Sequence, residues 1–151
     1  ETAKIYDLQN PGSKMSKSGE SPQGILWLLD EPSVTAKKLK SAVTDNDREI
    51  RFDQGEKPGV SNLLTIYAAL TGRQIPSIED EYAGRGYGDF KKGLAEVVVN
   101  EFGPVRERAL ELLADPAELD RVLASNADRA AEVAERTLGD VYDKIGLLRR
   151  R

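Results

Sequence analysis

The chain has 151 residues, enough for one domain with its own core, and 39% hydrophobic with 32% charged residues indicates a globular class. A net charge of −4 disfavours a general nucleic-acid-binding surface, although a local basic patch can still contact phosphates. The absence of Cys and His excludes disulfides, thiolate chemistry, the usual zinc sites and histidine-dependent triads, and no apolar run reaches the roughly 20 residues of a membrane span.

The first 30 residues predict little regular structure. Residues 2–8 could form a short strand or a turn, and residues 10–13 have strong turn chemistry because Pro fixes φ and Gly accepts positive φ. Residues 24–30 form a brief apolar run, which is more consistent with a buried strand or one helical turn than with a surface. Trp27 is therefore expected in the core.

Helical periodicity begins after this run. Ser33 is expected to cap a helix over residues 34–43, with Lys37, Lys38 and Lys40 on its solvent side. Such a lysine run could touch nucleic acid, but on a helix it is usually a solvated face.

Two shorter helices follow. One runs over residues 61–72 and ends at Gly72, which suits a left-handed C-terminal cap. The next is capped by Ser77, has acidic residues in its first turn, and stops at Gly84.

Two long helices complete the chain. The first begins at Gly88 and should kink at Pro104, which cannot donate to the carbonyl four residues back. Asp115 caps the second, whose apolar stripe continues to Ile145 unless Asn126 splits the helix in two. The pattern predicts a mainly α fold, a bundle of about five helices.

Residues 10–24, NPGSKMSKSGESPQG, place two lysines and four serines around the only methionine. Such a loop can be a flexible solvated connection. Alternatively, its two ammonium groups can grip a polyphosphate, with backbone N–H groups and hydroxyls filling in. It is not a P-loop, because the G-x-x-x-x-G-K-[ST] pattern is absent.

Residues 14–18 read KMSKS, the second signature of class I aminoacyl-tRNA synthetases, and a chance match is on the order of 1 in 10⁴. The flanking strings LDEPSVTAKKLKSAVTD, KPGVSNLLTIYAALTG and YGDFKKGLAEVVV resemble bacterial tryptophanyl-tRNA synthetases, over residues 3–147. The related tyrosyl enzymes usually have a different loop, with Phe and Gly after the first Lys.

The resemblance implies the carboxy-terminal half of a tryptophan–tRNA ligase, a cytoplasmic homodimer that forms tryptophanyl-adenylate from tryptophan and ATP and transfers it to tRNA(Trp). Residues 1–32 would be the end of a Rossmann-like catalytic domain with its KMSKS loop. Residues 33–151 would be a helical anticodon-recognition domain, whose last helix can pack back on the catalytic half. The start at Glu1 indicates a fragment, and the missing half would hold the first signature and the tryptophan pocket. The isolated chain is therefore not expected to be active.

The same resemblance implies the ATP site. Lys14 and Lys17 would be catalytic, holding the ATP phosphates as pyrophosphate leaves, while Met15 anchors the loop and Ile5 lies where the backbone meets the adenine. The implied ATP-binding set is Ile5, Lys14, Met15, Ser16, Lys17 and Ser18. Mg²⁺, if involved, would travel with ATP, because no carboxylate cluster is committed to a metal.

A second set is expected at tRNA: Arg73, Arg85, Tyr87, Lys91 and Lys92. An aromatic side chain among cations in the Gly-rich turn of residues 84–92 suits unstacked anticodon bases. The alternative is a capped helix start with Tyr87 packed on the core. Arg73 could equally complement the dipole at a helix end.

Two other hypotheses stay open. The chain could be a free-standing helical module that binds nucleic acid or a protein and keeps a relic loop. It could also be another class I synthetase or a ligase-like paralogue. A reading frame that extends upstream and encodes the first signature would favour the ligase, and an initiator codon at residue 1 would favour the free-standing module.

Overall fold

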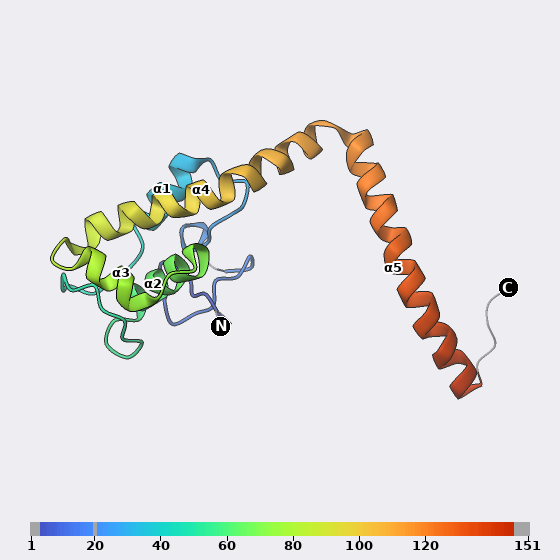
Figure 1. The fold of residues 1–151 in the computed structure, drawn as a ribbon, viewed down its shortest axis with the longest axis horizontal. Coiled ribbons are helices and arrows are strands. Elements are labelled where there is room, and N and C mark those ends of the chain that lie inside the picture. The colour runs from blue at the N-terminus through green and yellow to red at the C-terminus, as the bar shows by residue number, and fades with distance from the viewer. Residues whose placement is uncertain (1–3, 20, 147–151) are drawn as a thin grey trace. The chain divides into compact units, whose positions relative to one another are not determined.

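The computed structural model describes residues 4–19 and 21–146, and helices make up most of residues 32–145 (Figure 1). The elements are η1 (Pro22–Gly24), α1 (Pro32–Lys40), α2 (Pro58–Thr71), α3 (Ile75–Tyr82), α4 (Gly86–Ala114) and α5 (Pro116–Ile145). Within the described part of the chain, extended pairing is limited to one antiparallel bridge between Tyr6 and Lys14. The mainly α prediction is confirmed.

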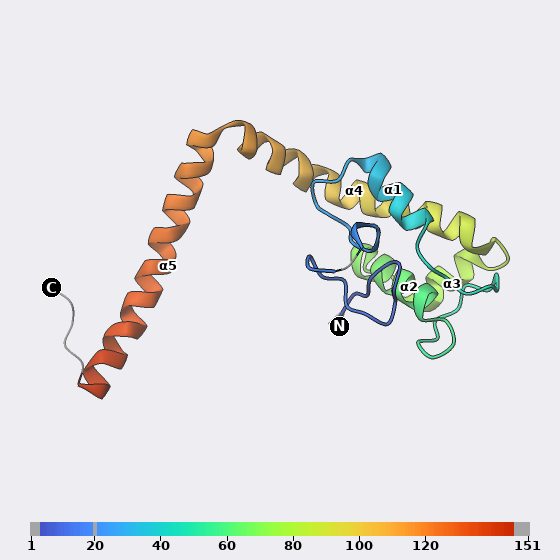
Figure 2. The ribbon, with the colours of Figure 1, turned by 180° about the vertical axis from the view of Figure 1, so that it is seen from behind.

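The chain divides into two compact units, residues 1–107 and residues 108–151. The division falls within α4, and the α1 to α3 helices of the first unit are seen from behind in Figure 2. The predicted boundary at residues 32 and 33, between a catalytic part and an anticodon-recognition part, is a different division and stays a prediction.

The first unit is built around one apolar core. Each of its helices contributes at least one side chain that is almost fully buried, including Leu39 of α1, Leu64 of α2, Ile78 of α3 and Phe90 of α4. The Phe90 ring meets the Tyr82 ring edge to face, with 5.3 Å between their centroids. Burial of this set ties the four helices together.

Prolines set where α1 and α2 begin. Both helices have Pro in the first turn, so they start before the positions predicted at Ser33 and Ser61. Pro has a helical φ and lacks an N–H that the first turn would leave unpaired, so the helix starts before its apolar pattern does. The starts predicted for α3 and α4 were also too late, since these helices begin at Ile75 and Gly86.

The predicted helix ends agree with the structure more closely than the predicted starts do. Gly72 follows α2 with a φ of 68°, and its N–H donates to Ala68, as a left-handed cap does. The Asp115 side chain accepts a 3.0 Å hydrogen bond from the Glu118 N–H and caps α5. Of the two alternatives at Asn126, the split is wrong: α5 continues through this residue, whose side chain donates to the Val122 carbonyl. α4 continues through Pro104, where the kink stays a prediction.

Two further expectations were wrong. Trp27 is 42% exposed, because residues 27–30 form a tight turn in which the Asp30 N–H donates to the Trp27 carbonyl. Lys38 is buried rather than solvated. Its ammonium donates to the Ile25 carbonyl at 2.8 Å and pairs with Asp30, so the charge keeps partners inside the protein.

The helix α5 carries an apolar stripe but contains no buried residue. Val133, Leu138, Val141 and Ile145 are all at least 43% exposed.

We expect the 151-residue chain to self-associate as its concentration rises, because burying the apolar stripe of α5 between two chains lowers the free energy. Sedimentation velocity over a concentration series checks this, with a Leu138→Gln, Val141→Gln variant as the form expected to stay monomeric. A strict monomer at every concentration would contradict it.

Candidate functional site

The lysine loop, residues 14–23, is closed at its base by backbone hydrogen bonds. At its start, the Asp7 N–H donates to the Ser13 carbonyl at 2.9 Å, and the Met15 N–H donates to the Ile5 carbonyl at 3.0 Å. Beyond its end, the Gly24 carbonyl accepts from the Leu8 N–H at 3.0 Å. Both ends of the loop are therefore fixed on consecutive residues of one short segment.

A buried carboxylate, Asp7, lies beneath the loop. Its Oδ1 accepts hydrogen bonds from the N–H groups of Gln9, at 2.7 Å, and Asn10, at 3.0 Å. The same carboxylate packs on Gly24, where an added methyl group would lie 2.0 Å from Oδ1. Only glycine fits there. Asp7 was not predicted as a site residue.

The loop holds its two predicted catalytic lysines in the open. Lys14 and Lys17 are exposed, whereas Met15 is half-buried and packs against the core. The Ser16 and Ser18 hydroxyls lie 3.1 Å apart, and a turn from Ser16 to Gly19 is closed by a 2.8 Å backbone hydrogen bond. The structure thus presents Lys17 and two hydroxyls on one tight turn, with Lys14 two residues before it, and together these are a donor set suited to phosphate oxygens.

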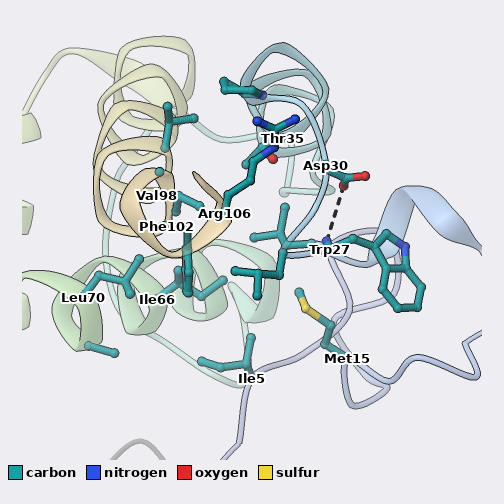
Figure 3. A pocket seen from close by; sticks show the side chains of 16 residues that line it. Ile5, Met15, Trp27, Asp30, Thr35, Ile66, Leu70, Val98, Phe102 and Arg106 are labelled. Carbon is teal, nitrogen blue, oxygen red and sulfur yellow. Dashed lines mark hydrogen bonds between the residues drawn. The ribbon is translucent and has the colours of Figure 1, made fainter. Parts of the chain in front are cut away.

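An apolar cavity of about 310 Å³ lies beside the loop. Figure 3 shows Met15 and Trp27 on one side of it and Leu70 and Val98 on the other, with Ile5 also in the lining. The predicted adenine-contacting residue, Ile5, and the predicted loop anchor, Met15, therefore both line this cavity. α2 and α4 line it as well, through Leu70 and Val98.

A network of charged side chains lies at the start of α2 and α4. The buried Lys57 ammonium lies 2.8 Å from Asp47, 3.3 Å from Asp45 and 3.1 Å from the Tyr87 hydroxyl. The Tyr87 hydroxyl in turn donates to Asp45 at 2.6 Å. Burial alone would lower the pKa of Lys57, but its hydrogen bonds to Asp47, Tyr87 and Asp45 outweigh this and raise the pKa.

The same network predicts a pH dependence of folding. The hydrogen bond from Lys57 lowers the pKa of Asp47 from 3.8 to about 2, so the stabilisation is present above pH 3.8 and is lost as the pH falls through 2. We expect Asp47→Asn to lower the melting temperature at pH 6 and to have a much smaller effect at pH 2, where the carboxylate is already about half protonated. Thermal unfolding across this range checks it, and an equal loss at both pH values would contradict it.

The residues predicted at tRNA lie in different environments. Arg73 pairs with Glu81 at 2.6 Å, and Arg85 and Lys92 are exposed. Tyr87 is half-buried in the Lys57 network. The Lys91 ammonium is turned inward, where it donates to the Ala42 carbonyl at 2.8 Å and to the Thr44 hydroxyl at 3.1 Å, and burial lowers its pKa.

Within residues 4–19 and 21–146, no three acidic side chains are grouped so that they could hold a metal ion. No helix in this same part of the chain is long and apolar enough to cross a membrane.

The family model for tRNA synthetases class I (W and Y) matches residues 2–103, and the chain belongs to this family. Two curated relatives are tryptophan–tRNA ligases. The chain is 64% identical to the tryptophan–tRNA ligase of Leifsonia xyli, over 97% of the chain and 43% of the relative. It is 49% identical to that of Listeria monocytogenes, over 99% of the chain and 45% of the relative. The predicted resemblance is confirmed, and the chain spans less than half the length of these relatives.

Solved structures agree with the sequence comparison. The fold is similar to that of the tryptophanyl-tRNA synthetase of Mycoplasma pneumoniae, with a TM-score of 0.83 and 31% identity over 97% of the chain and 46% of that protein. It is also similar to the Campylobacter jejuni enzyme complexed with ADP and tryptophan, with a TM-score of 0.67 and 30% identity over 96% of the chain and 44% of that protein.

Proposed function

We propose that this chain is the carboxy-terminal portion of a tryptophan–tRNA ligase. The complete protein, a cytoplasmic homodimer, would join tryptophan to ATP as tryptophanyl-adenylate and then transfer the amino acid to tRNA(Trp). The observation that carries this proposal is the KMSKS loop, which is fixed at both ends and presents Lys14 and Lys17 to solvent. The tryptophan-specific names of the relatives support the choice of amino acid.

In the proposed reaction, a carboxylate oxygen of tryptophan attacks the α-phosphorus of ATP, and the bond to the bridging oxygen of pyrophosphate breaks. The leaving pyrophosphate takes the electron pair and gains charge. Lys14 and Lys17 would stabilise that charge, with Ser16 and Ser18 as further donors, and Ile5 would contact the adenine through its backbone. A divalent cation such as Mg²⁺ would arrive bound to the ATP phosphates.

The helical part is proposed to bind the tRNA anticodon. Arg85 and Lys92 are exposed near the start of α4, where cations can reach phosphates. Arg73, Tyr87 and Lys91 belong to the proposed set as well. The buried hydrogen bonds of Lys91 mean that a direct contact of its ammonium with tRNA would need this residue to turn outward.

The proposal is tested with the complete protein that contains this sequence. It should exchange pyrophosphate into ATP only when tryptophan is present, and it should charge tRNA(Trp). The 151-residue chain alone should do neither, because the reacting groups must be held together. Exchange by the complete protein with another amino acid but not with tryptophan would overturn the proposal.

A further inference from the structure

A buried side chain of α2, Asn62, holds the segment that carries the lysine loop. Its Oδ1 accepts from the Tyr6 N–H at 2.9 Å, and its Nδ2 donates to the Tyr6 carbonyl at 2.8 Å. Asn62 is only 4% exposed, and 56 residues separate the partners in sequence. The carboxamide therefore satisfies both backbone groups of one residue, as a neighbouring strand would.

The place of this double hydrogen bond is specific. Tyr6 lies directly opposite Lys14 in the antiparallel bridge. The flanking residues Ile5 and Asp7 bond toward the loop, through the Ile5 carbonyl and the Asp7 N–H. Because backbone groups of an extended segment alternate in direction, the N–H and the carbonyl of Tyr6 point away from Lys14. The Asn62 side chain hydrogen-bonds both groups from the side opposite to Lys14.

Asn62 itself has little freedom to move. Residues 59–64 of α2 are all buried, and Val60, Leu63 and Leu64 form part of the core. The hydroxyl of the preceding residue, Ser61, accepts a 2.8 Å hydrogen bond from the Asp53 N–H, which fixes the loop before α2. Because α2 is held in the core, the Asn62 carboxamide fixes the Tyr6 backbone, which lies opposite Lys14, at a set position relative to α2.

We propose that Asn62 is a positioning residue for the lysine loop: it sets the place of the Ile5–Asp7 backbone, and through it the place of Lys14 at the ATP phosphates. This inference rests on the proposed function, because it assigns Asn62 to the same ATP site. Asn62 would not touch ATP.

The test uses Asn62→Asp in the complete protein. The aspartate keeps the shape and can accept from the Tyr6 N–H, but as a carboxylate it cannot donate, so the Tyr6 carbonyl loses its partner. Asn100→Asp makes the same chemical change at an exposed position of α4 and serves as the control. Asn62→Ser, which is uncharged and smaller, is the second variant in case the charge prevents folding.

The decisive readout separates the two substrates. Steady-state pyrophosphate exchange with Asn62→Asp, expressed per titrated active site, should show kcat/KM for ATP lowered about tenfold, with KM for tryptophan unchanged within about twofold. A purely structural role would lower only the number of active sites, so kcat/KM for ATP per active site and both KM values would stay unchanged. The Asn62→Asp, Lys14→Ala double variant should lose little more than Lys14→Ala alone, because one side chain acts through the other.

The outcomes separate this inference from the proposed function. If Lys14→Ala is impaired while Asn62→Asp and Asn62→Ser keep normal ATP kinetics, the positioning role is wrong and the proposed function stands. If the losses of Asn62→Asp and Lys14→Ala simply add, the positioning role is also wrong. If Lys14→Ala itself behaves as the unmodified enzyme, both the loop assignment and this inference fail.

Discussion

Replacing Lys14 or Lys17 by alanine in the complete protein should slow tryptophanyl-adenylate formation by about 10²–10³, or roughly 3–4 kcal/mol of barrier. Both ammonium groups are exposed on a loop whose base is held by backbone hydrogen bonds, so they can approach the phosphates as charge develops on pyrophosphate. Their contribution should fall on the chemical step rather than on tryptophan binding. Single-turnover adenylate formation at saturating ATP measures it.

Two further variants sharpen this prediction. Lys40→Ala removes another exposed lysine, at the end of α1, and should react at the unmodified rate. Lys17→Arg should recover only part of the loss, because a planar guanidinium cannot reproduce a compact ammonium. Near-normal rates for both Lys14→Ala and Lys17→Ala would mean that the loop is only a connection.

Phe90→Ala should lower the free energy of unfolding by about 3–5 kcal/mol, the largest stability effect expected in the chain. Phe90 is fully buried, and its ring contacts both Tyr67 and Tyr82, with centroid distances of 6.2 Å and 5.3 Å. Its removal would leave a cavity where α2, α3 and α4 meet. Urea unfolding checks this, followed by the fluorescence of Trp27, the only tryptophan.

The matched control lies on the same helix. Phe102 is 42% exposed, so Phe102→Ala removes the same atoms from a site that is already partly in water. Its effect should be well below that of Phe90→Ala. Equal losses for the two variants would show that the aromatic cluster around Phe90 is not the centre of the core.

The helices could be predicted because their causes are local. Apolar spacing located each helix, and single residues such as Gly72 and Asp115 marked their ends. The errors at the starts of α1 and α2 arose where Pro32 and Pro58 extend a helix beyond its apolar pattern. A rule that gave the prolines more weight would have moved both starts to the right place.

The burial of Lys38 and Lys91 could not be predicted from the local sequence pattern. Lys38 was expected in water because charged side chains usually lie there. It is buried because a carbonyl of Ile25 and the carboxylate of Asp30, both earlier in the chain, converge on its ammonium. Lys91 is buried for a similar reason, beneath the Ala42 carbonyl. Such partners come together only when the chain has folded.

In the candidate site, too, the residues that are contiguous in sequence could be predicted, and those brought together by folding could not. The lysines and serines of the KMSKS loop are contiguous, so the family resemblance of this pentapeptide could mark the loop as a candidate ATP site from the sequence. Asp7 and Asn62, which fix the base of that loop, were not predicted. Asn62 lies 56 residues from its partner, and neither residue belongs to the pentapeptide. Nothing in the local pattern distinguishes this asparagine from a solvent-facing one.

The backbone of Tyr6 and Leu8 has a consequence for association between chains. An extended segment with unpaired N–H and carbonyl groups is a template on which another molecule can add a strand. Here Asn62 occupies both groups of Tyr6, while the Gly24 carbonyl and the Val43 N–H occupy those of Leu8. A helix side chain and two loop residues thus cap this segment against intermolecular β-pairing and the aggregation that follows from it.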